Sequence, residues 1–297
     1  AVGSAAMIAN TTGTENVAVG RSALDANTTA NNNTAVGYES MTTNTTGAAN
    51  TAVGRTSLHA NSTGANNTAI GMGSLESNTT ANNNTAIGKN TLQSNTTGAS
   101  NVAAGLEALK TNTTGASNIA IGVGALENNT TANFNVAVGH DAMLSNTTGA
   151  ENVSIGYQAL DANTTGGTNV AIGYIALGAN TTASNNVAVG PYSLDACTTG
   201  GTNTAVGGAS LGAATTATGN TAIGHNAGNT ATTSGSNTLL GRDTQPSNAT
   251  SSGHEISIGA NATGKGSSTG FINPNGGGVY QGNNSTTWSQ TSDIRIK

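Results

Sequence analysis

The sequence repeats itself every seventeen residues. Residues 33–49 read NTAVGYESMTTNTTGAA, and residue 50 opens the same phrase again. The glycine that closes each such phrase, here called the marker glycine, recurs without a slip at Gly3, Gly20, Gly37, Gly54, Gly71, Gly88, Gly105, Gly122, Gly139, Gly156, Gly173, Gly190, Gly207, Gly224 and Gly241. A fixed period of this size is typical of a solenoid, in which each unit buries apolar residues only against its neighbours. We therefore expect an all-β chain, a parallel β-solenoid or β-roll of 17-residue coils.

Each coil is expected to contain one short strand, in the three residues before the marker glycine. This triplet reads Thr, Val or Ile, then nearly always Ala, then an apolar residue, as in Val17-Ala18-Val19. Its first and third side chains lie on one face and the Ala on the other. Leu or Met follows four residues after the glycine, in a segment of helix formers that favours one helical or 3₁₀ turn.

Charged residues separate the inside of the coil from the outside. Through Asp243, every Asp, Glu, Lys, Arg and His stands one, two, five or twelve residues after a marker glycine, as Arg21, Glu39, Asp25 and Glu151 do. We expect these positions to face water. The Val/Ile, Ala and Leu positions never carry a charge, so we assign them to the inside of the coil. Association of several chains would bury the Ala-rich face as well.

Two asparagine columns recur along the chain. The first stands four residues before the marker glycine (Asn16, Asn33, Asn50, Asn67, Asn84, continuing to Asn237), and the second seven residues after it (Asn10, Asn27, Asn44, Asn61, continuing to Asn180). Stacked coils place identical amides about 4.8 Å apart, within reach of hydrogen bonds up the column and to turn backbone groups. We expect a structural role for both columns rather than ligand binding. The second column changes to Cys197 and then Ala214, which predicts a looser stack there.

Composition excludes several classes of protein. Charged residues make up 7% and aromatic residues 3% of the chain, too few to favour an enzyme acting on an external substrate. A net charge of −5 without a basic stripe argues against nucleic acid, and no apolar run is long enough for membrane insertion. The lone Cys197 and the scattered histidines predict neither a disulfide nor a metal site, and we expect no cofactor.

The threonine pairs raise the possibility of an ice- or glycan-binding solenoid. An ice-binding rank favours Thr-x-Thr, whose hydroxyls point the same way, whereas Thr45-Thr46 and Thr96-Thr97 are adjacent and a strand would send one to each side. The NTT triplets also match the Asn-x-Thr glycosylation pattern, but inward-facing asparagines could not carry glycans.

Phrases such as NTAVG, NVAIG and NVSIG, followed by Ser or Ala and then Leu, resemble the heads of trimeric autotransporter adhesins. The resemblance covers residues 1 to about 242. It implies a left-handed β-roll and a homotrimer, although the repeats of those heads are shorter.

The pattern breaks after Gly241. We assign 1–242 to the solenoid shaft, 243–263 to a degenerate terminal coil, and 264–291 to a Gly/Ser/Asn-rich neck, in which Trp288 is a packing anchor. Residues 292–297, SDIRIK, together with the preceding GVYQGNNSTTW, resemble the junction to an endosialidase-type intramolecular chaperone of bacteriophage tail fibres and tailspikes.

That second resemblance implies self-cleavage. In that family the junction opens a domain that trimerises the fibre and then cuts itself off. By resemblance, Ser292 is the nucleophile, Lys297 its general base, and the scissile bond joins Ser292 to Asp293. A serine needs a neighbouring base, and a desolvated lysine can serve as one. This single-turnover reaction requires the downstream chaperone domain.

The sequence therefore predicts the structural shaft of a bacteriophage tail fibre or tailspike, a virion protein involved in host attachment. Its expected partners are two further copies of the chain and a host cell-surface receptor, a glycan or an outer-membrane component. The alternative is a trimeric adhesin or extracellular filament at the bacterial surface, and a further alternative is the ice- or glycan-binding solenoid.

Overall fold

The computed structural model describes residues 1–250, 253–273, 278–282, 287 and 289–290. The chain divides into two compact units, Ala1–Glu151 and Asn152–Lys297, and each is described by itself. It is an all-β parallel β-solenoid of about 15 coils set 17 residues apart. No helix occurs in the described residues. The fold class predicted from the period is confirmed.

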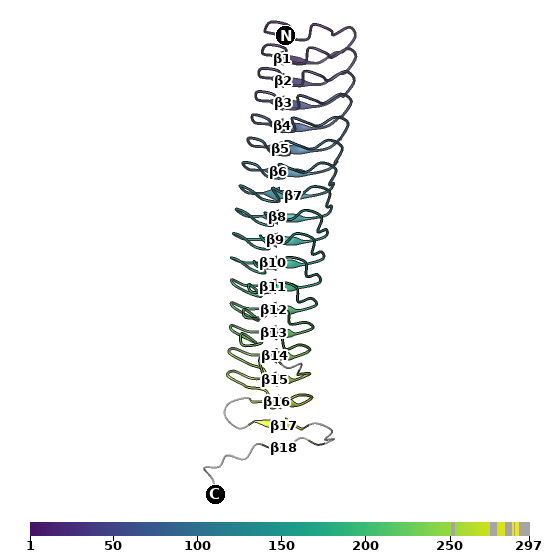
Figure 1. The fold of residues 1–297 in the computed structure, drawn as a ribbon. Coiled ribbons are helices and arrows are strands. Elements are labelled where there is room, and N and C mark those ends of the chain that lie inside the picture. Colours follow the sequence, from purple (N-terminus) through teal and green to yellow (C-terminus); the bar gives the residue numbers. More distant parts are fainter. Residues whose placement is uncertain (251–252, 274–277, 283–286, 288, 291–297) are drawn as a thin grey trace. The chain divides into compact units, whose positions relative to one another are not determined.

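In the first unit each coil contributes one three-residue strand, and the strands stack one on the next (Figure 1). All pairs are parallel and in register, so that Ala18 lies opposite Ala35 and Ala35 opposite Ala52. The strands are β1 (Val17–Val19), β2 (Thr34–Val36), β3 (Thr51–Val53), β4 (Thr68–Ile70), β5 (Thr85–Ile87), β6 (Val102–Ala104), β7 (Ile119–Ile121) and β8 (Val136–Val138).

The second unit continues this pattern and then departs from it. Its parallel strands are β9 (Val153–Ile155), β10 (Val170–Ile172), β11 (Val187–Val189), β12 (Thr204–Val206), β13 (Thr221–Ile223), β14 (Thr238–Leu240), β15 (Ile256–Ile258) and β16 (Gly270–Ile272). Between β14 and β15 the spacing grows by one residue, yet Thr238 still pairs with Ile256. Strands β17 (Val279–Gln281) and β18 (Ser289–Gln290) then run antiparallel. Parallel stacking thus extends into the segment assigned to the neck.

The strands turn their small residue inward. Ala18 is 1% exposed, whereas Val17 and Val19 on either side of it are 49% and 40% exposed. The assignment of the Val/Ile positions to the inside of the coil, and of the Ala-rich face to association between chains, is wrong. One cross-section of the coil also holds a fully buried Leu or Met and two asparagine side chains in most coils, so a small residue, nearly always Ala, fits beside them. The predicted burial of the Leu/Met position is confirmed from Leu24 to Leu211.

The helix formers after the marker glycine predicted a helical or 3₁₀ turn, and this prediction is wrong. Residues two and four positions after the glycine have positive φ, such as Ser22 (54°) and Leu24 (53°). Ser22 N–H donates to Ser4 O in the preceding coil at 2.9 Å, and Leu24 N–H to Ser40 O in the following coil at 3.0 Å. A helical turn would direct these donors to its own carbonyls. Bonding between coils therefore overrides local helix propensity.

The marker glycine is required at the corner between strand and turn. Gly54 has a φ of 141°, and a Cβ at this position would overlap the carbonyl group of Gly71 in the next coil. Any side chain would therefore force adjacent coils apart, which explains why the glycine recurs without exception.

Candidate functional site

The first asparagine column links each coil to the two beside it. The backbone N–H of Asn50 donates to Asn33 Oδ1 at 2.9 Å, and Asn50 Nδ2 donates to Gly64 O in the following coil at 2.8 Å. Asn67 repeats the first contact with Asn50 Oδ1, also at 2.9 Å. These side chains are fully or almost fully buried. Each side-chain amide thus satisfies buried backbone groups beside the strand, which would otherwise need a water molecule as hydrogen-bond partner.

The second asparagine column meets the first at one carbonyl. Asn61 Nδ2 donates to Asn44 Oδ1 at 2.8 Å and to Gly64 O at 2.9 Å. Gly64 O therefore accepts from both Asn50 and Asn61. The two columns together hold the threonine turn against the strand, and in the first unit they form a continuous amide ladder. These amides bond within the chain, in keeping with a structural role for both columns.

The ladder loses an amide where Cys197 replaces asparagine. The Cys197 thiol donates to Gly200 O at 3.2 Å, but it gives no donor to Asn180 Oδ1, which is buried without a hydrogen-bond partner. Burial raises the pKa of the Cys197 thiol to about 11. Since the thiolate is the nucleophile, this cysteine is poorly reactive in the folded chain.

The proposed cleavage residues Ser292, Asp293 and Lys297, and also Trp288, lie outside the described residues.

The two threonines of a pair differ in exposure, although the segment that holds them is a turn and not a strand. Thr45 Oγ1 donates to Ser62 O in the next coil at 3.1 Å, while the Thr46 side chain is exposed. One hydroxyl per coil therefore faces outward at this edge, in a single rank.

The outer strand face, formed by the first and third residues of each strand, is apolar and half-exposed. In the first unit its most exposed members are Val17, Val19, Val53, Ile70, Ile87, Val102, Ile119 and Ile121; in the second they are Ile155, Ile172, Ile223, Leu240 and Ile256. Thr fills many of the remaining first positions, and neither position carries a charge from β1 to β15. Sequence reasoning missed this surface because it placed these side chains inside. The sequence feature that indicated this outer face was the pair of larger residues, mostly Thr, Val or Ile, on either side of a smaller Ala.

Charged side chains lie at the surface, as their offsets predicted. Across residues 1–243 no Asp, Glu, Lys, Arg or His is buried. In the first unit Lys110 pairs with Glu107 at 3.1 Å and with Glu127 at 3.8 Å. Within the described part of the chain, no three His, Cys, Asp or Glu residues gather as metal ligands, and no helix is long and apolar enough to cross a membrane.

Comparison of the chain with protein-family models, with curated proteins and with solved structures finds no match in any of the three.

We predict that breaking the amide ladder destabilises the first unit. Asn95 Nδ2 donates to Asn78 Oδ1 and Gly98 O, and Asn95 Oδ1 accepts from Asn112. Asn95→Ala removes all three bonds and leaves buried groups unpaired, which should lower the free energy of unfolding by about 3 kcal/mol. Urea denaturation followed by circular dichroism measures the change. The exposed Thr97 in the same coil gives the control, since Thr97→Ala should cost less than about 0.5 kcal/mol. Equal effects of the two variants would show that the ladder contributes nothing.

We predict that the Cys197 thiol reports unfolding. With a pKa near 11 in place of 9.0, its thiolate fraction at pH 8 is about a hundred times smaller than that of an ordinary cysteine. Complete burial slows access further. Reaction with a disulfide reagent at pH 8 should be at least about a hundredfold slower in buffer than in denaturant. Rapid labelling under native conditions would contradict the closed stack around Cys197.

Proposed function

We propose that the chain is part of the structural shaft of a bacteriophage tail fibre or tailspike, a homotrimer that serves in host attachment. The observation that carries the proposal is the outer strand face. Soluble monomers rarely expose a large contiguous apolar patch, and here the apolar columns recur from strand to strand in both units.

A second and third copy of the same chain are the partners that suit this face. Its side chains repeat once per coil, about 4.8 Å apart, so an identical face presents the same period and the same β-branched shapes. Most soluble oligomers are closed, symmetric assemblies of identical chains. Three shafts packed around one axis would each bury the outer strand face and leave the charged corners in water.

The junction motif supports maturation by a chaperone domain downstream of Lys297. In this proposal the domain aligns three chains, Ser292 and Lys297 then cleave the bond before Asp293, and the shaft remains in the virion. The receptor is a host-surface glycan or an outer-membrane component.

We predict that a charge on the outer strand face prevents trimer formation. Ile121 is 43% exposed in the single chain, so Ile121→Lys should change the stability of the coil little but place three ammonium groups within the trimer contact. The parent should sediment as a trimer and Ile121→Lys as a monomer in analytical ultracentrifugation. Thr114→Lys, at the exposed threonine edge of the neighbouring coil, is the control and should remain trimeric. A monomeric parent would overturn the proposed assembly.

We predict that the chain, extended through the sequence that follows it in its gene, cleaves itself once after Ser292. Intact mass under denaturing conditions should show a product ending at Ser292 in the parent and the uncut chain in Ser292→Ala. Native mass should show the cleaved product as a trimer. Uncut trimers in both would favour a bacterial surface adhesin, and uncut monomers in both would exclude a chaperone-matured fibre.

A further inference from the structure

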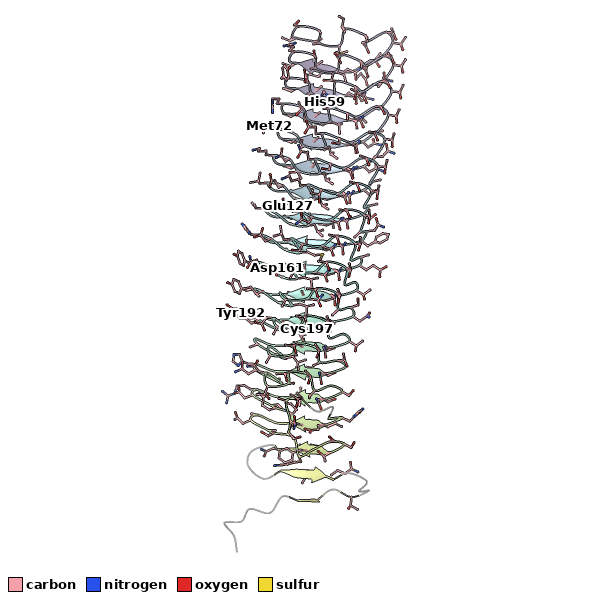
Figure 2. The ribbon with its side chains drawn as sticks, viewed as in Figure 1. His59, Met72, Glu127, Asp161, Tyr192 and Cys197 are labelled. Carbon is pink, nitrogen blue, oxygen red and sulfur yellow. The ribbon has the colours of Figure 1, made fainter. Side chains whose placement is uncertain are left out.

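Three tyrosines form a row on the second unit. The chain has only five tyrosines, and Tyr157, Tyr174 and Tyr192 fall in three consecutive coils. Each follows a marker glycine by one or two residues, at the corner where the chain leaves the strand. Figure 2 labels Tyr192 at the edge of its coil. The three side chains are 44–45% exposed. An aromatic-poor chain thus concentrates accessible rings at one place.

The rings contact one another and still leave surface open. The Tyr157 and Tyr174 rings are stacked, with centroids 5.4 Å apart and planes inclined by 10°. Since stacked planes in contact lie about 3.5 Å apart, this centroid distance requires a lateral offset of about 4 Å. Each ring therefore presents part of one face. The Tyr192 ring stands edge-on to Tyr174, at 5.2 Å and 71°, and bounds the row at one end.

The carboxylate of Asp195 lies near the row. Asp161 and Asp195 each stand five residues after a marker glycine and are the only Asp or Glu residues between 152 and 241, a segment that has no Lys or Arg. Partial desolvation, Tyr174 and the nearby Asp195 carboxylate together raise the pKa of the Tyr192 hydroxyl. Desolvation also raises the pKa of Asp195. The site therefore combines partly open ring faces with the carboxylate acceptor of Asp195 and carries negative charge.

We propose that Tyr157, Tyr174 and Tyr192, with Asp195, bind a strand of neutral polysaccharide laid along the coils of the second unit. This rests on the proposed role in host attachment and names the receptor chemistry. Sugar rings have apolar C–H faces that pack on aromatic rings, and hydroxyls that donate to carboxylates. The ring spacings of 5.4 and 5.2 Å approach the length of one sugar residue in an extended chain. The Asp195 carboxylate would repel polymers of acidic sugars.

Coil stability alone does not account for the row. At the same corner position other coils carry Arg55, Met72 or Lys89 and keep the same strand register. The solenoid therefore does not require tyrosine there. Tyrosine faces beside carboxylates also attract organic cations, but a single ring suffices for a cation, whereas a row with one ring per coil suits a polymer.

The test is affinity electrophoresis of the full chain in gels containing dextran, mannan, xylan, mixed-linkage β-glucan or hydroxyethyl cellulose, with calorimetry on any polymer that retards it. Alginate serves as the acidic polymer and polylysine as the cationic one. We expect retardation by at least one neutral polymer and not by alginate. Retardation by none of the neutral polymers, or binding of polylysine alone, overturns the proposal.

Variants locate the binding. Tyr174→Ala should weaken affinity about tenfold or more, and Tyr174→Phe, which keeps the ring, by less than about threefold. The matched control is Tyr38→Ala in the first unit, because Tyr38 is similarly exposed at the same corner position but lies under the Arg21 guanidinium, 5.6 Å from its ring centroid. Tyr38→Ala should leave affinity unchanged. Equal losses in Tyr174→Ala and Tyr38→Ala would place binding elsewhere.

Sedimentation of the same preparation separates this inference from the proposed function. A trimer that binds no neutral polymer refutes the glycan site and leaves the shaft standing. A monomer that binds through Tyr174 supports the site and refutes the trimeric shaft.

Discussion

Hydrogen bonds between one coil and the next are the interaction on which each unit depends. Strand N–H groups, the donors of the left-handed turn and the asparagine amides all reach residues one coil away. A coil buries a single large aliphatic side chain, too little on its own to offset the ordering of seventeen residues. Because these bonds join each coil to the next in one fixed register, one inserted residue disturbs all of them at once. The fixed period follows from this coupling.

The first place where the period slips, between β14 and β15, shows how a coil absorbs the disturbance. After Asp243 the chain gains a residue, and Glu255 takes the position that asparagine holds in earlier coils: its N–H donates to Asn237 Oδ1 at 3.2 Å. The buried Glu255 carboxylate accepts from the backbone N–H of Ser247 at 2.8 Å and from its hydroxyl. Glu255 thus keeps the backbone hydrogen bond of the first asparagine column, while its side chain bonds to Ser247 in the adjacent loop. Two coils later the chain reverses into antiparallel strands.

Period, strand positions and the buried Leu were predictable because each repeats as a column that local chemistry explains. The strand face that points into the coil was not predictable. Alternation gives two faces without saying which is inside, and hydrophobicity favours Val and Ile over Ala. Available volume decides instead, since the buried columns of Asn50 and Asn61 and the buried side chain of Leu58 favour a small residue such as Ala52 between them. The positive φ at Leu58 could not be predicted either, because Leu is a strong helix former. The hydrogen bonds between coils that hold this turn form only when the coils are stacked.

A solenoid lets its exposed columns vary freely, and this one does so at its corners. One residue after the marker glycine stand Arg21, Tyr38, Arg55 and Met72 in successive coils. The outer strand face is comparably exposed, yet the same positions hold only Thr, Val, Ile, Ala or Leu from β1 to β14. Strand propensity narrows the choice, but exposed strands readily accept charges, which also guard against unwanted association. Uniformity at an exposed surface points to a constraint from outside the coil, and the proposed contact with other copies of the chain would supply one.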